Sequence, residues 1–129
     1  MNRRQSLGTL AAFGAALSSP AAAAGKPIQL HVDMEVDPAR EKEMLAAYNT
    51  QFQPTIRKQP GFVDVKLMKL RTAVAGKAPA GMTYRLLISF ETEEQRLKWV
   101  ATADHQRVWP KVEACLKGQK YIVLLYDLQ

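Results

Sequence analysis

Hydrophobic and polar residues alternate strictly from Ile28 to Val36. A spacing of two places alternate side chains on opposite faces of a β-strand. One face of the predicted strand is polar and carries Gln29, His31, Asp33 and Glu35. The other carries Ile28, Leu30, Val32, Met34 and Val36.

A helix is predicted directly after this strand, from about Pro38 to Lys58. Asp37 and Pro38 provide an N-cap and a first-turn proline. Five apolar residues have the spacing of one helix face, so this face is expected to be buried: Met44, Leu45, Tyr48, Phe52 and Ile56. Pro54 is expected to bend or shorten the last turn, and residues 59–61, Gln-Pro-Gly, end the helix.

Two further strands are predicted at 62–71 and 82–91. In the first of them, Val63, Val65 and Leu67 share one face, and both faces carry apolar residues. The connection from Thr72 to Gly81 is longer than a tight hairpin needs. It is interpreted as an excursion, with the cover of a pocket as the alternative.

The second helix begins at a capping box formed by residues 92–95, Thr-Glu-Glu-Gln. A break is expected at 101–104, followed by a second helical piece from His105 to Leu116. Pro110 is expected to lie where a new turn begins, and Gly118 to close the helix. The last strand is predicted from Tyr121 to Leu128.

The order strand, helix, strand, strand, helix, strand predicts an α+β, ferredoxin-like βαββαβ domain with a four-stranded antiparallel sheet. Two helices cover only one face of such a sheet. The other face would expose Met68, Leu70 and residues of the last strand. A homodimer that closes sheet against sheet around a cavity is therefore expected.

Composition narrows the class of protein. A chain of 129 residues with 47% hydrophobic residues fits one domain, expected at 25–129. Residues 1–24 have a charged start, a short apolar run and a small-residue end, which is typical of a signal peptide. Arg3 and Arg4 suggest twin-arginine export, with general secretion as the alternative, so a periplasmic or secreted location is expected.

Without that segment the chain carries 16 basic and 12 acidic residues, a net charge of +4. The basic residues are scattered, which argues against a nucleic-acid partner. No membrane span is expected in the mature chain. The single Cys115 excludes an internal disulfide and a cysteine-based metal site, and it is expected to be buried and inert.

Four segments carry a resemblance to a known family: VDPARE at 36–41, QPGF at 59–62, ISFETEE at 88–94 and ADHQ at 103–106. Together they resemble the antibiotic biosynthesis monooxygenase domain family. The resemblance covers Ile28 to Leu128. This resemblance implies a dimeric α+β barrel and either cofactor-independent oxygenation of aromatic compounds or haem degradation. Many members end the third strand with tryptophan and an acidic residue, where this chain has Phe90 and Glu91.

Candidate catalytic residues are His31, Arg85 and His105. His31 shares its face with Asp33 and Glu35, and a carboxylate can hold a histidine in one tautomer for proton abstraction. Arg85 is a candidate for stabilising a phenolate or enolate. The candidates for substrate contact are Asp33 and the aromatic residues Tyr84, Trp109, Tyr121 and Tyr126.

Two functions follow as hypotheses. The first is an exported monooxygenase-like enzyme without a bound cofactor, in which His31 or His105 removes a proton from a small aromatic or quinol-type compound. The second is a binding module of the same fold that holds a small molecule, or haem, without turnover. Haem-degrading relatives use Asn, Trp and His in their pocket, whereas here the first strand has no Asn and Trp99 lies in a helix.

Overall fold

The computed structural model describes residues 26–129, so the predicted signal segment at 1–24 lies outside the described residues. Four strands form one antiparallel sheet: β3 (Ile28–Val36), β4 (Phe62–Lys69), β5 (Tyr84–Phe90) and β6 (Leu116–Asp127). Their spatial order is β4-β5-β3-β6. This is the predicted α+β, ferredoxin-like arrangement.

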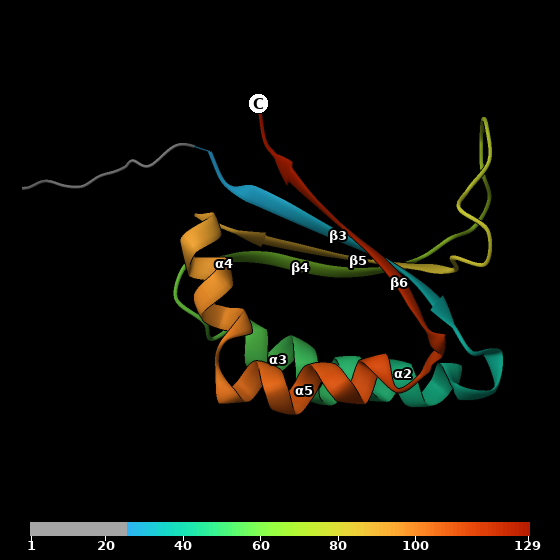
Figure 1. Ribbon diagram of the computed structural model, residues 1–129, viewed down its shortest axis with the longest axis horizontal. Helices are drawn as coiled ribbons and strands as arrows, with labels where there is room; N and C mark the ends of the chain where they lie inside the picture. The colour runs from blue at the N-terminus through green and yellow to red at the C-terminus, as the bar shows by residue number, and fades with distance from the viewer. Residues whose placement is uncertain (1–25) are drawn as a thin grey trace, which may run out of the picture.

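The helical segments all lie on one side of the sheet (Figure 1). The first helical region contains η2 (Pro38–Arg40), α2 (Glu41–Ala47), the π-helical turn η3 (Tyr48–Phe52) and α3 (Gln53–Ile56). The second contains α4 (Glu93–Val100) and α5 (Ala103–Glu113). Among residues 26–129, no helix is both long and apolar enough to cross a membrane.

The π-helical turn explains how the first helical region keeps one buried face. The most buried residues of this helical region recur at every fourth position: Met44, Tyr48, Phe52 and Ile56. In an ideal helix of 3.6 residues per turn, each such step drifts by about 40° around the axis. The wider π-turn over 48–52 offsets this drift, so Phe52 reaches the middle of the core.

The strands present a helix side and an open face. Ile28, Leu30, Val32, Met34 and Val36 face the helices and are buried, as predicted for that face. The register then places Arg85 of β5 and Ile122 of β6 opposite Asp33. We define the open face by the residues that point away from the helices: Gln29, His31, Asp33, Met68, Arg85, Leu87, Ile122, Leu124 and Tyr126.

A bulge in β4 corrects the predicted faces of that strand. Phe62 pairs with Phe90, but Asp64 pairs with Ser89, so Val63 is the extra residue. Phe62 therefore packs edge to face on Phe90 at a centroid distance of 6.2 Å, whereas Val63 is exposed. Alternation alone predicted the reverse, because one inserted residue exchanges the two faces.

The end of the second helical region also differs from the prediction. Pro110 lies inside α5, and the helix ends at Glu113. The proline is exposed, and water can satisfy the carbonyl that lacks its usual N–H partner. Gly118 does not close the helix, because it lies within β6 with a φ of 62°.

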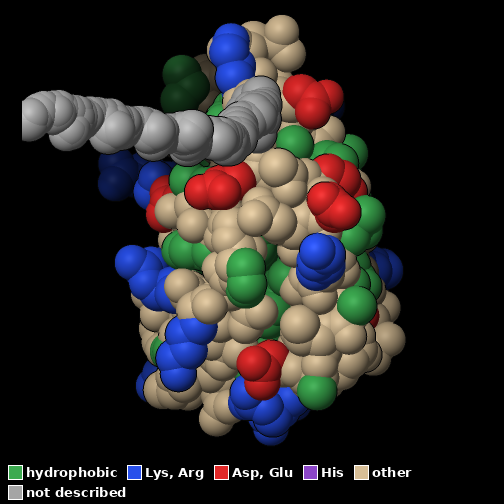
Figure 2. Space-filling model, turned by 90° about the vertical axis from the view of Figure 1, so that its left-hand side faces the viewer, with side chains coloured by type: hydrophobic (Ala, Val, Ile, Leu, Met, Phe, Trp, Pro, Cys, Tyr) green, Lys and Arg blue, Asp and Glu red, His purple; other side chains and the backbone are tan. Residues whose placement is uncertain are grey.

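Charges are mixed on the end of the molecule where α4 lies. Figure 2 shows Lys and Arg side chains interspersed there with acidic and hydrophobic ones. Neither positive nor negative charge therefore predominates on this face.

Candidate functional site

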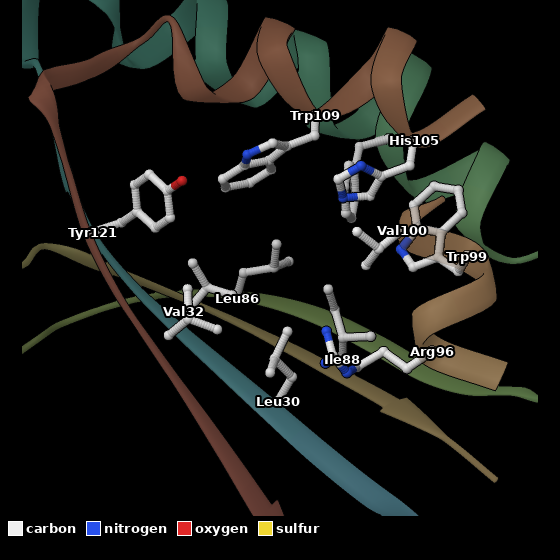
Figure 3. A pocket seen from close by; sticks show the side chains of 12 residues that line it. Leu30, Val32, Leu86, Ile88, Arg96, Trp99, Val100, His105, Trp109 and Tyr121 are labelled. Atoms are coloured by element: carbon white, nitrogen blue, oxygen red, sulfur yellow. The ribbon is translucent and has the colours of Figure 1, made fainter. Parts of the chain in front are cut away.

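A cavity of ≈180 Å³ lies between the sheet and the helices α4 and α5. Figure 3 shows the strand side chains Leu30, Val32, Leu86 and Ile88 below the cavity and Trp109 and His105 above it. Tyr121 lies at one end of the cavity, and Trp99 and Arg96 lie at the other. Most of its lining is apolar. The lining residues are Leu30, Val32, Phe52, Leu86, Ile88, Arg96, Trp99, Val100, His105, Trp109, Tyr121 and Val123.

Helical spacing directs the functional side chains into this cavity. Arg96 precedes Trp99 by three residues and Val100 by four, so all three lie on one face of α4. His105 and Trp109 are likewise four residues apart on α5. Two threonine caps set where each helix begins, and hence which residues face inward.

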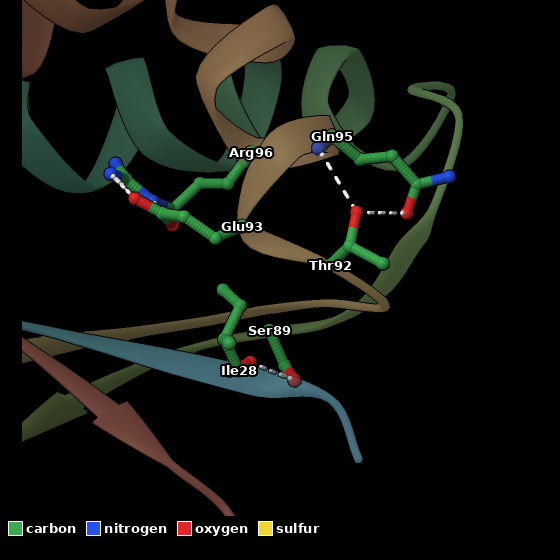
Figure 4. Close-up of polar contacts among 6 residues, drawn as sticks. All are labelled: Ile28, Ser89, Thr92, Glu93, Gln95 and Arg96. Carbon is green, nitrogen blue, oxygen red and sulfur yellow. Dashed lines mark hydrogen bonds and ion pairs between the residues drawn. The ribbon is translucent and has the colours of Figure 1, made fainter. Parts of the chain in front are cut away.

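Those caps are visible as hydrogen bonds. Thr92 Oγ1 accepts from the backbone N–H of Gln95 at 3.1 Å and donates to the Gln95 side chain (Figure 4). Thr102 Oγ1 accepts from the backbone N–H of His105 at 3.0 Å. His105 is thereby held in the first turn of α5, beside the end of α4.

Tyr121 reaches the cavity because β6 is irregular. Val36 pairs with Leu116, yet Met34 pairs with Tyr121, so three extra residues lie in β6 between these pairs. Gly118 and Gln119 have φ values of 62° and 54° in this bulge. Without the bulge, the odd separation of Leu116 and Tyr121 would place Tyr121 on the open face.

His105 is the central polar group of the cavity wall. Its Nδ1 atom is the one buried side-chain nitrogen or oxygen among residues 26–129 that has no hydrogen-bond partner. The ring packs edge to face on Trp99 at a centroid distance of 5.0 Å. Burial, and then the positive charge of Arg96, lower the pKa of His105, so the ring is neutral at pH 7.

Arg96 supplies a positive charge at the same wall. Its Nε and Nη2 atoms donate to the two carboxylate oxygens of Glu93 at 2.6 and 2.7 Å, as Figure 4 shows. The Arg96 side chain is only 16% exposed, against 37% for that of Glu93. This hydrogen-bonded pair raises the pKa of Arg96 and lowers that of Glu93, so both groups remain charged.

The other end of the cavity has a second polar contact. Tyr121 donates its hydroxyl proton to Glu113 Oε2 at 2.9 Å. Trp109 packs edge to face on Tyr121 at 5.5 Å and on Phe52 at 6.2 Å. Hydrogen bonding to Glu113 and burial raise the pKa of Tyr121, so this hydroxyl stays protonated. The Tyr121 side chain therefore forms part of the cavity wall.

The site residues predicted from the sequence lie in separate parts of the structure. His105, Trp109 and Tyr121 line the cavity. His31, Asp33, Arg85 and Tyr126 lie together on the open face instead. The structure therefore brings His31 and Arg85 close to each other but not to the cavity that holds His105.

The open-face residues satisfy one another. Arg85 donates to Asp33 Oδ1 at 2.6 Å, and His31 Nε2 donates to Gln29 Oε1 at 2.8 Å. The ring of Tyr126 lies 4.7 Å from that of His31. Burial, then Arg85, lower the pKa of His31, while Asp33 opposes this shift weakly.

Tyr84 does not line the cavity and lies on the helix side of the sheet, where it pairs with Met34. Its hydroxyl donates to Glu41 Oε2 at 2.5 Å, and Lys69 binds the same oxygen at 2.7 Å. Burial and this contact raise the pKa of Tyr84 to about 12. Tyr84, Asp33 and Arg85 do border a second hollow of ≈290 Å³ beside the loop at 72–81, but their polar groups are already paired there.

Arg96 and Trp99 were not identified as site residues from the sequence. Arg96 looks like an ordinary i, i+3 partner of Glu93, and Trp99 looks like a core residue. The available signal was the spacing of Arg96, Trp99 and Val100 after the Thr92 cap. It could have indicated a shared face but not the cavity above it.

Haem is larger than this cavity, which is partly open to solvent and would enclose only part of the macrocycle. A cavity of ≈180 Å³ is close to the size that accommodates a single aromatic ring, whereas haem is a macrocycle of four pyrrole rings. Within residues 26–129, no three His, Cys, Asp or Glu side chains are grouped so that they could hold a metal ion. The lining residues instead suit a small, flat, mainly apolar compound with one polar group.

Comparisons with known proteins identify the fold. No family model matches the chain, and no curated protein matches its sequence. Solved structures do match at probability 1.00.

Three of these structures illustrate the range. A proposed antibiotic biosynthesis monooxygenase from Bordetella bronchiseptica is 21% identical, with a TM-score of 0.65, over 81% of this chain and 99% of that one. SnoaB, a cofactor-independent oxygenase from Streptomyces nogalater, is 13% identical, with a TM-score of 0.60, over 81% and 95%. A dimeric ferredoxin-like protein of unknown function from Jannaschia sp. CCS1 is 13% identical, with a TM-score of 0.67, over 79% and 99%.

The chain is therefore similar in fold to antibiotic biosynthesis monooxygenases and to a dimeric ferredoxin-like protein. The resemblance drawn from the sequence is confirmed at this level. At these identities the likeness concerns the fold, and function must be argued from the cavity.

Proposed function

We propose that this protein is a cofactor-independent oxygenase that acts on a small aromatic or quinol-type compound in the cavity of ≈180 Å³. The observation that carries the proposal is the position of the His105 ring, which lines this cavity among aromatic side chains and beside the positive charge of Arg96.

The chemistry follows from the protonation state of His105. Because its pKa is lowered, the ring is neutral at pH 7 and can accept the proton of a phenolic hydroxyl. The resulting phenolate is electron-rich and reacts with dioxygen at a ring carbon. Overall, a phenol and O₂ give a quinone and water: one oxygen atom forms the new C=O, and the other leaves as water with the two hydrogens that the phenol loses.

Arg96 has a stabilising part in this reaction. Negative charge that develops on the substrate oxygen is favoured by a positive group in a poorly solvated wall. Arg96 takes the role predicted for Arg85, since Arg85 lies on the open face beside Asp33. The role assigned to His31 passes to His105 for the same reason.

Oxygen consumption with a set of phenols and quinols tests the proposal. We expect H105Q to lower kcat/KM by about 10²–10⁴-fold, the usual contribution of a general base. H31Q is the matched comparison, because His31 is a histidine of lowered pKa outside the cavity. No oxygen uptake above background, or a loss confined to H31Q, would contradict the proposal.

A homodimer through the open face completes this proposal. Met68, Ile122, Leu124 and Tyr126 are exposed there, and a surface with several large apolar residues favours a partner. The similar Jannaschia protein is dimeric. A second copy would cover the face that the helices leave free in Figure 1.

Export is also part of the proposal. Residues 1–24 carry the pattern of a signal peptide, with Arg3 and Arg4 at its start. We expect R3K/R4K to retain the protein in the cytoplasm if the route is the twin-arginine one. Unchanged export of that variant would instead support general secretion, and a full-length cytoplasmic wild-type chain would contradict export.

One observation favours a second candidate, a binding module without turnover. A catalytic histidine is usually oriented by a hydrogen bond at the nitrogen that does not react, and among residues 26–129 the buried Nδ1 atom of His105 has no hydrogen-bond partner. Native purification followed by mass spectrometry separates the two functions. A bound compound recovered unchanged after incubation in air would support the binding module.

A further inference from the structure

Trp99 presents an unused hydrogen-bond donor to the cavity. The residue is 2% exposed, lies at the end of α4 and lines the cavity. Its backbone carbonyl accepts from Thr102 Oγ1 at 2.7 Å, but its indole N–H has no hydrogen-bond partner among residues 26–129. A buried tryptophan usually has a partner for this group, so we expect a bound compound to supply it.

This N–H group can be reached from the cavity. Figure 3 shows the indole nitrogen on the edge of the Trp99 ring that faces the cavity. Nδ1 of His105 differs, because it is enclosed by the protein, whereas the Trp99 nitrogen is not among the enclosed unpartnered atoms of residues 26–129. A ligand can therefore meet the Trp99 N–H without displacing the wall.

The α4 end of the cavity offers donors only. An indole N–H donates and does not accept, and the same is true of a guanidinium. Arg96 lies three residues before Trp99 on the same helix face, where Glu93 holds its Nε and Nη2 atoms. This end therefore suits an oxygen that accepts hydrogen bonds. A ring without such an oxygen leaves the Trp99 donor unpaired, which weakens its binding.

We propose that the indole N–H of Trp99 donates a hydrogen bond to the oxygen of the bound phenol and makes the cavity selective for rings that carry such an oxygen. This inference rests on the proposed function, because it adds a substrate-binding residue to the same cavity. A hydrogen bond to a charged oxygen is roughly twice as strong as one to a neutral oxygen. The bond therefore strengthens as negative charge develops on the substrate, and Trp99 contributes to catalysis as well as to binding.

The packing of the Trp99 ring does not need its nitrogen. The ring lies edge to face on Phe52 at a centroid distance of 5.9 Å and on His105 at 5.0 Å. A residue that served only as a core anchor would make these same contacts. The deciding experiment must therefore observe the N–H group itself.

NMR spectroscopy of the full chain labelled with ¹⁵N, kept under nitrogen gas, observes this group directly. The chain contains two tryptophans, Trp99 and Trp109, so W109F identifies the indole signal of Trp99. We expect saturating phenol to move the Trp99 indole proton signal downfield, as a hydrogen bond does. Toluene is the control ligand, because it has the ring of phenol without the oxygen. An equal effect of phenol and toluene on this signal would overturn the inference.

W99F measures what the hydrogen bond contributes, because phenylalanine keeps an aromatic ring and lacks the N–H. We expect W99F to weaken phenol binding in calorimetry by about 3–10-fold more than toluene binding, the usual value of one neutral hydrogen bond. W109F is the matched control: Trp109 lines the same cavity, but Figure 3 shows its nitrogen turned toward Tyr121. W109F should affect the two ligands alike. Equal losses for phenol and toluene in a W99F chain that circular dichroism shows to be folded would contradict the proposed bond.

The two proposals fail separately. A downfield shift of the Trp99 signal with phenol, without oxygen uptake in air, would leave this inference standing and contradict the oxygenase. Oxygen uptake with phenols that is unchanged in W99F would support the oxygenase and overturn the role of Trp99.

Discussion

The rings of Trp99 and His105 meet edge to face, with centroids 5.0 Å apart and an interplanar angle of 82°. Trp99 is at the end of α4 and His105 at the start of α5, so the short break at 101–102 creates the contact. Trp99 is 2% exposed and anchors the ring against the core. The cavity wall is therefore built at the junction between two helices.

This packing predicts that H105F is as stable as the wild type or more stable at pH 7. Phenylalanine keeps the edge-to-face contact and removes the unsatisfied Nδ1 atom, and apolar replacement of a buried polar group is often neutral or stabilising. Urea denaturation at pH 7 measures the difference. A loss of more than about 2 kcal/mol would mean that Nδ1 has a partner in the folded protein.

The pH dependence of stability should change in the same variant. The pKa of His105 is lowered in the folded state, so at acidic pH the unfolded chain binds the proton more readily. The stabilisation due to neutral His105 is complete above about pH 6.5 and is lost as pH falls through the lowered pKa. We expect the stability of H105F to fall less steeply between pH 7 and 5, with a remaining slope in which His31 takes part because its pKa is also lowered. An unchanged slope would contradict this.

The bulge in β6 offers a test of how Tyr121 is positioned. G118A places a side chain at a φ of 62°, which costs on the order of 1–2 kcal/mol, although the new Cβ meets only ordinary contacts. G76A is the matched control, with a φ of 72° and open space around it. We expect both to lose similar stability in thermal denaturation, and only G118A to weaken phenol binding. Equal binding by the two variants would show that the bulge does not control Tyr121.

The ion pair on the open face should contribute more than an ordinary surface pair. The Asp33 side chain is 8% exposed, so R85M leaves a nearly buried carboxylate without its partner. We expect R85M to lower the free energy of unfolding by about 1–3 kcal/mol. R107M breaks a pair in which both side chains are half exposed and should cost less than about 1 kcal/mol. Similar losses would contradict the difference.

The proposed dimer predicts a twofold molecular mass in solution. L124D places a charge on the open face, on the edge strand β6, and should give the monomer mass in light scattering at micromolar concentration. L97D is the control, because Leu97 is exposed on α4, on the opposite side of the sheet. A wild-type monomer, or an L124D dimer, would contradict an interface at this face.

The order of the elements could be predicted from the sequence because the spacing of hydrophobic residues depends only on residues close together along the chain. Alternation marked β3 at its full length, and threonine and aspartate caps marked where the helical regions begin. These signals depend on neighbours a few residues apart along the chain. They also predicted that one face of the sheet would be free of helices, as Figure 1 shows.

The location of the cavity depended on tertiary structure. The sequence placed the site on the open face through His31 and Arg85, whereas the cavity lies beneath the helices and joins His105 with Arg96 and Tyr121. Bulges at Val63 and Gly118 decided which faces Phe62 and Tyr121 occupy, and a single inserted residue exchanges faces without altering the hydrophobic composition. The sequence by itself determined which elements form and in what order; the volume left between their packed side chains, and hence the ligand that fits, was decided only when distant residues came together.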